Sequence, residues 1–139
     1  MYATQQDLID RYGTPRLVQL TDIGLPQTGE INATVVAGRL ADASAEVDGY
    51  FGARVAVPMA APVAPMVRLV TTRIAYALLL GAAASDTDRA DLADARKYLM
   101  AIARGEIPLP SAAVDANSAT PAGDTVAFEP GRKDWGGGE

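Results

Sequence analysis

Apolar residues recur at spacings of three and four along residues 32–54. Charged residues such as Arg39 and Asp42 fall between these positions. A stripe of this kind predicts an amphipathic helix that turns one side toward a core. We therefore expect a long helix over about 32–54, with Gly49 and Gly52 weakening its last turns. The stripe consists of Val36, Leu40, Ala43, Val47, Tyr50 and Phe51.

The next helix is predicted to be buried on most of its surface. Residues 66–83 are apolar on nearly all sides, and Pro65 precedes them as a helix-opening residue. The connection at 55–65 contains three prolines, so it cannot continue the preceding helix and is expected to be an extended crossover.

A fifth helix is predicted over about 87–104, with Ser85 or Asp86 as its cap and Gly105 as its end. Acidic residues come in its early turns and basic residues later, an order that suits the helix dipole. Asp88, Asp91 and Asp94 lie off its apolar stripe and should form the side that faces solvent. The stripe consists of Leu92, Ala95, Leu99 and Ile102.

Two short helices are predicted ahead of the long ones. Thr4 and Asp7 have the spacing of an acidic capping box, which predicts a helix over 5–12. A second helix should follow directly, with Thr14 as its cap and Pro15 at its first position, where a missing N–H costs nothing.

Together these elements predict an all-α fold, a small bundle of about five helices over residues 1–110. The content of Gly, Pro and Asp predicts a loop at 21–30. Residues 111–139 contain many Gly, Ala, Ser and Pro residues and few large apolar ones, so they should not fold alone. We expect them to form an extended, flexible C-terminal tail that is ordered only on assembly.

The composition narrows the possible chemistry. The chain has no cysteine and no histidine, which excludes disulfides, thiolate zinc sites, cysteine nucleophiles and histidine general bases. A net charge of -5 argues against a general nucleic-acid surface, because neutralising phosphates requires clustered Lys and Arg. We therefore predict that the chain is not an enzyme and has no catalytic, metal-binding or cofactor-binding residues.

Targeting signals are not expected either. No run reaches the roughly 18–20 uncharged apolar residues that a membrane span needs. The longest candidate, residues 69–84, is interrupted by Thr71, Thr72 and Arg73. The N-terminus lacks the basic-then-apolar order of a signal peptide. These observations predict a cytoplasmic, unprocessed protein without membrane contact.

The acidic residues near the start of the fifth helix are candidates for a metal or acid–base site. Asp86, Asp88, Asp91 and Asp94 are close in sequence, but they flank an apolar stripe near a helix start. This placement favours a solvated face that satisfies the helix dipole. Asp22 and Glu30 are a weaker candidate for a divalent cation, since their loop lacks the alternating acids of a calcium loop.

Arg68 and Arg73 stand out because they interrupt the apolar helix at 66–83. Charged residues on a buried helix are usually paired. One interpretation pairs them with Glu46, Asp48 or an acid of the fifth helix, and the other places them against a neighbouring subunit.

The tail carries the remaining candidate interface residues. Phe128 and Trp135 are large apolar residues in a segment otherwise poor in them, and they would serve as anchors on a partner. Arg132 and Lys133 lie between them and are weak candidates for a phosphate contact. The alternative is a plain disordered end.

Several segments resemble a family of Mu-like phage and prophage proteins. The most specific is LADASAEVDGYFGARV, followed by a proline-containing loop and an apolar helix. The resemblance covers about residues 1–110. Its segments are MYAT at 1–4, DLIDRYG at 7–13, LVQLTD at 17–22, LADASAEVDGYFGARV at 40–55, RKYL at 96–99 and IARGEIPLP at 102–110.

This family resembles the head–tail adaptors, or head-completion proteins, of long-tailed phages. The resemblance implies an all-helical subunit that assembles as a twelve-fold ring under the portal protein and extends the DNA channel. The ring would present a surface to a tail-side connector or stopper protein in the neck of the virion. In such an assembly we expect the loop at 21–30, the crossover at 55–65 and the tail at 111–139 to carry the contacts between subunits. The resemblance also implies that DNA passes without sequence-specific binding, which suits the net negative charge.

Two other classes remain open at this stage. One is a small prophage-encoded binding or regulatory module that recognises a host factor. The other is an enzyme that uses Asp or Glu, which would require a concave pocket with inward-facing acids, whereas the amphipathic pattern points the acids outward.

Overall fold

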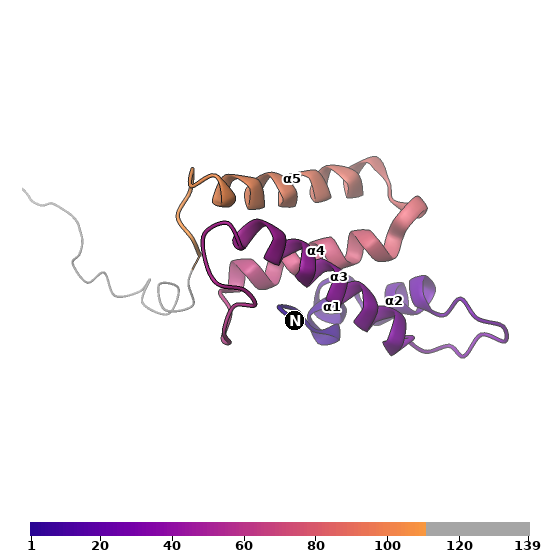
Figure 1. Ribbon diagram of the computed structural model, residues 1–139. Helices are drawn as coiled ribbons and strands as arrows, with labels where there is room; N and C mark the ends of the chain where they lie inside the picture. Colours follow the sequence, from indigo (N-terminus) through magenta and orange to yellow (C-terminus); the bar gives the residue numbers. More distant parts are fainter. Residues whose placement is uncertain (111–139) are drawn as a thin grey trace, which may run out of the picture. The chain divides into compact units, whose positions relative to one another are not determined.

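Five α-helices make up most of residues 1–110, the part of the chain that the computed structural model describes (Figure 1). No strand occurs in this part, so the all-α class and the predicted set of helices are confirmed. A short 3-10 turn at Gly81–Ala83 follows the fourth helix. The helices are α1 (Gln5–Tyr12), α2 (Thr14–Thr21), α3 (Ala33–Phe51), α4 (Pro65–Leu80) and α5 (Asp86–Ala103).

The capping boxes that begin α1 and α5 are confirmed. The Thr4 hydroxyl accepts from the amide of Asp7 at 3.2 Å, and the Asp7 carboxylate accepts from the amide of Thr4 at 2.8 Å. Ser85 and Asp88 repeat this arrangement, with amide-to-side-chain distances of 3.1 and 2.9 Å. Ser85, rather than Asp86, is therefore the N-cap of α5. Each box satisfies two amides that the helix itself leaves unpaired.

Gly13 replaces Thr14 as the N-cap of α2, which corrects the prediction. Its φ of 89° lies in a region that residues with a Cβ rarely adopt. Gly13 also closes α1, since its amide donates to the carbonyl of Ile9 at 2.9 Å. One residue thus ends one helix and begins the next, so Thr14 already lies inside α2 and Pro15 follows at the second position.

The two long central helices end earlier than predicted. α3 stops at Phe51, not Arg54, where the amide of Gly52 makes the last bond, to Asp48 at 2.8 Å. α4 stops at Leu80 because Gly81 turns to a φ of 52°. The Arg54 guanidinium lies beyond α3, where its Nη1 donates to the carbonyls of Ile102 at 3.1 Å and Ile107 at 3.3 Å. Arg54 thereby satisfies backbone groups at the C-terminal end of α5.

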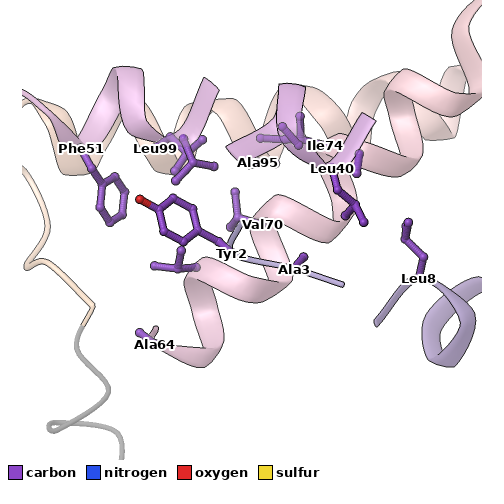
Figure 2. Packing of buried hydrophobic residues seen from close by; sticks show 14 of the residues in the cluster. Tyr2, Ala3, Leu8, Leu40, Phe51, Ala64, Val70, Ile74, Ala95 and Leu99 are labelled. Carbon is purple, nitrogen blue, oxygen red and sulfur yellow. The ribbon is translucent and has the colours of Figure 1, made fainter. Parts of the chain in front are cut away.

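α4 is the centre of the core, because it contacts each of the other four helices. Its buried positions occur on several sides, as its all-round apolar pattern predicts. Figure 2 shows Val70 and Ile74 among buried side chains from other elements, including Leu99 of α5. Thr71 is buried on this helix as well, and its hydroxyl is satisfied because it donates to the carbonyl of Val67 at 2.8 Å.

Within the described residues, the segment Pro65–Ala83 has the length and mean hydropathy of a membrane span. It also carries Arg68 and Arg73, which is why the sequence showed no uninterrupted run. Its apolar side chains fill the centre of the bundle, and core helices commonly meet the same criteria. We therefore interpret this segment as the core helix of the fold.

The N-terminal segment joins the core in a way that the sequence pattern did not predict. Tyr2 is buried, and Figure 2 shows its ring between Phe51 and Val70. Its amide donates to the Ser44 hydroxyl at 3.1 Å, and its own hydroxyl donates to the Asp48 carboxylate. That hydroxyl also accepts from the amide of Met59 at 2.7 Å. Tyr2 therefore ties the connection between α3 and α4 to the side of α3.

Candidate interaction surfaces

Arg68 lies on the exposed side of α4, and its partner is not one that the sequence suggested. Its Nε is 3.9 Å from Oδ2 of Asp7 on α1, and 56% of its side chain is exposed. Glu46 and Asp48 are engaged elsewhere, with Arg96 and Tyr2 respectively. A long, solvent-exposed pair of this kind contributes little to stability. More than half of the Arg68 side chain therefore remains available on the surface.

Arg73 lies on another side of α4 and is only partly exposed. It lines a narrow cleft with Tyr12, Tyr76, Asp88 and Asp91. Within residues 1–110 no carboxylate approaches Arg73 to 4.0 Å, so the predicted ion pair is not formed. Burial raises the pKa of Tyr12, and the positive charges of Arg11 and Arg73 oppose that rise.

The two tyrosines of this cleft stack on one another. The ring centroids of Tyr12 and Tyr76 are 3.6 Å apart, with an interplanar angle of 8°. Nε of Arg16 donates to the Tyr76 hydroxyl at 3.1 Å, and the Arg11 guanidinium lies 5.9 Å from the Tyr12 ring. The cluster joins α1 and α2 to α4. The periodicity of the sequence gives no sign of this cluster, because its members come from three separate helices.

Glu46 and Arg96 form the closest ion pair between two helices. Nε of Arg96 donates to Oε2 of Glu46 at 2.8 Å, and Nη2 donates to Oε1 at 3.1 Å. This two-pronged bond links α3 to α5, and the Glu46 carboxylate raises the pKa of Arg96. Glu46 is therefore a structural residue between these helices and not a partner of Arg68.

The acidic residues of α5 form the solvated face that the sequence predicted. Asp91 and Asp94 are exposed, and Asp86 pairs with Arg89 on the same surface at 3.0 Å. The Asp88 carboxylate accepts bonds from the Ser85 amide and hydroxyl, which lower its pKa. Among residues 1–110, no three acidic side chains are placed to hold a metal ion.

Asp22 organises the loop between α2 and α3. Its carboxylate accepts from the amides of Thr28 at 3.0 Å and Gly29 at 2.7 Å, and these bonds lower its pKa. At the base of the loop, the amide of Asn32 donates to the buried Thr21 hydroxyl at 2.9 Å. The carboxylate that the sequence suggested as a weak cation ligand therefore closes the loop instead.

The closed loop exposes two aliphatic side chains, which we call the loop tip. The exposed fractions of Ile23 and Leu25 are 73% and 94%. Figure 1 shows the loop standing out past the ends of α2 and α3. An isolated exposed aliphatic residue is ordinary, but two on a braced loop form a protruding apolar surface.

A second apolar surface lies where the N-terminal segment meets the first half of α3, and we call it the N-terminal cleft. It is an open hollow of about 380 Å³ with no charged side chain in its lining. Its floor includes Val36 and Leu40, while Ala33 and Ala37 leave room above them. The full lining is Met1, Ala3, Thr4, Gln5, Ala33, Val36, Ala37 and Leu40.

The remaining candidate interface residues lie outside the described part of the chain. They are Phe128, Arg132, Lys133 and Trp135, together with the predicted tail at 111–139 as a whole. Within the described part, the sequence pointed to Arg68, Arg73 and the loop at 21–30, which contains the loop tip, but not to the N-terminal cleft. Ile23 and Leu25 offered one signal, since they are the large apolar residues of a loop rich in Gly, Pro and polar residues.

Comparison with known proteins gives the family of the chain. No curated protein shows significant similarity to it. The protein family described as Bacteriophage Mu, Gp36 matches residues 2–128, which is most of the sequence. The match agrees with the resemblance to Mu-like phage proteins noted in the segments quoted above. The chain therefore belongs to the bacteriophage Mu Gp36 family.

Proposed function

We propose that this phage protein is a head–tail adaptor: a structural subunit that forms a ring between the portal protein and a tail-side connector or stopper protein. The ring extends the DNA channel, and DNA passes through it without sequence-specific binding. The subunit is made in the host cytoplasm and ends in the neck of the virion. Membership of a bacteriophage family supports the setting, and the helical bundle supports the type of subunit.

One observation carries the assembly role. Two apolar surfaces, the loop tip and the N-terminal cleft, lie open on a small helical unit. Most of the polar contacts of this unit serve its own fold, as Tyr2, Glu46 and Asp22 illustrate. Exposed apolar surfaces on an otherwise well-closed subunit favour a protein that functions by contacting other proteins.

The same geometry favours a structural role over catalysis. Within residues 1–110, Asp7 and Asp10 line one surface hollow and Asp88 and Asp91 line another. Asp7 and Asp88 are engaged as helix caps, however, and Asp10 and Asp91 are exposed, whereas a catalytic acid or base is usually a sheltered group with a perturbed environment. We therefore propose no cofactor, no catalytic residue and no membrane contact for this chain.

The partners follow from this assignment. Neighbouring copies, twelve in a ring that matches the portal, form one set of contacts, and the portal and tail-side proteins form the others. Arg68, more than half exposed, is suited to one of these contacts. Residues 111–139 are proposed to anchor on the portal or on a neighbouring copy through Phe128 and Trp135, with Arg132 and Lys133 beside them.

The test is the mass of the purified protein in solution, alone and mixed with the portal ring from the same phage or prophage. An adaptor adds to the portal in a stoichiometry that matches the portal subunits. A stable small oligomer that ignores the portal and binds a host protein would contradict the proposal, and would support the alternative of a regulatory module.

A further inference from the structure

We propose that copies of this chain join head to tail, with the loop tip of one copy seated in the N-terminal cleft of the next. The inference rests on the proposed function, since it names the surfaces through which an adaptor ring would close. The self-association it describes can be measured on the protein alone, without the portal.

Hydrogen bonds close the base of the loop and leave its tip exposed. The Asp22 carboxylate bonds the Thr28 amide, the Thr28 hydroxyl and the Gly29 amide, at 2.7–3.1 Å. The bond between Asn32 and Thr21 closes the base. A pre-organised loop loses little conformational freedom when it binds. The loop nevertheless leaves Leu25 94% exposed. An exposed aliphatic side chain lowers solubility, and no contact within the described residues covers it.

The N-terminal cleft has the chemistry to receive such a tip. Its lining side chains are apolar or uncharged, and its hollow of about 380 Å³ has space for two aliphatic side chains. Ala33 and Ala37 lie one helical turn apart and are both exposed, so a neighbouring backbone can approach α3 closely. Burial of an apolar side chain against these lining side chains is favourable, whereas a charged side chain would lose hydration there, so the cleft favours an apolar occupant.

The tip and the cleft of one copy do not meet. Neither Ile23 nor Leu25 lines the cleft, and both are largely exposed. A knob and a hollow at different places on one molecule make a heterologous contact between copies. Repetition of such a contact closes into a ring when the rotation between copies allows it, whereas contact between identical patches stops at a dimer. The pair of surfaces therefore points to a second copy as the occupant.

Disulfide trapping tests this contact directly, because the chain contains no cysteine of its own. Leu25→Cys and Ala37→Cys are introduced singly and together in the full chain, and circular dichroism confirms the helical content of each variant. Mild oxidation is then carried out on the protein alone at high concentration and on the protein mixed with the portal. We expect the double variant to give a ladder of dimers, trimers and larger species. A mixture of the two single variants should stop at the heterodimer.

A matched control uses Met100→Cys together with Ala37→Cys. Met100 is another exposed apolar residue, but it lies on α5. This pair should not form a ladder. Separately, Leu25→Asp should weaken self-association by at least about tenfold, as expected for loss of a buried apolar anchor, while Met100→Asp should leave it unchanged.

Two results would overturn the inference. One is efficient cross-linking of Leu25→Cys to itself, which would show that identical loops meet. The other is the absence of any trapped species, both alone and on the portal. If the protein joins the portal in matching stoichiometry without trapping, the adaptor role stands and this contact is wrong. If the ladder forms but the portal is not bound, the contact stands and the adaptor role is wrong.

Discussion

Replacing Tyr2 by phenylalanine tests whether the N-terminal segment holds the α3–α4 connection in place. The substitution keeps the buried ring and removes only the hydroxyl, which donates to Asp48 and accepts from the Met59 amide. A bond to a charged group contributes about 1.5–3 kcal/mol, and a neutral one about 0.5–1.5 kcal/mol. Both partners are only partly buried, so water recovers some of this loss. We expect the free energy of unfolding to fall by about 2 kcal/mol.

Tyr50→Phe is the matched control. Tyr50 is a partly buried tyrosine packed against the same core, but no hydrogen bond of its hydroxyl occurs within residues 1–110. Its loss should change the free energy of unfolding by less than about 0.5 kcal/mol. Urea unfolding followed by far-ultraviolet circular dichroism measures both variants, and comparison of midpoints is valid where the slope is unchanged. Equal, small effects of the two substitutions would refute the role assigned to Tyr2.

The ionisation of Tyr2 gives the same hypothesis a pH signature. Burial and the hydrogen bond to Asp48 raise the pKa of Tyr2 above its ordinary value of about 10. The neutral hydroxyl is therefore favoured in the folded state. Its contribution to stability is complete below about pH 10 and is lost as the pH rises through the folded pKa. The stability of Tyr2→Phe should fall less steeply above pH 10 than that of Tyr50→Phe.

Three further predictions concern other parts of the chain. Glu46→Gln should lower the free energy of unfolding by about 0.5–1 kcal/mol, with a smaller loss at high salt, because the pair with Arg96 is partly exposed. Urea titrations at two salt concentrations measure this effect. An unchanged free energy of unfolding at low salt would count against the prediction. Asp22→Asn should speed hydrogen exchange of the Gly29 amide without shifting the global unfolding midpoint, and unchanged exchange would show that the carboxylate does not close the loop. Deletion of 111–139 should leave a folded helical unit, by circular dichroism, that no longer joins the portal; a truncated protein that still completes heads would contradict this.

The features that sequence predicted well depend on neighbouring residues. The capping boxes at Thr4 and Ser85 involve residues three positions apart, so a short window contains both partners. The stripe of α3 follows from periodicity, and all its members except Tyr50 are fully buried. Gly13 was harder to predict because a glycine between two helices fits either an end or a cap, and the structure uses it as both.

The features that sequence did not predict join residues far apart in the chain. Tyr2 reaches Asp48 and Met59, and Arg96 reaches Glu46, across separations of 46, 57 and 50 positions. A single sequence offers many acids for each arginine, and only the packing of the helices decides which is near. Arg68 illustrates this. The packing of α1 on α4 places Asp7 beside Arg68, while Glu46 pairs with Arg96 of α5.

The position of Arg54 has a consequence for how the described unit responds to mechanical force. Its guanidinium joins the carbonyls of Ile102 and Ile107, near the place where the chain leaves α5. A force applied at Pro110 is therefore shared between the last turn of α5 and the segment after α3. Both bonds must break before α5 can peel away from its C-terminal end. The two Arg54 bonds should therefore raise the force needed to unfold α5 from its C-terminal end.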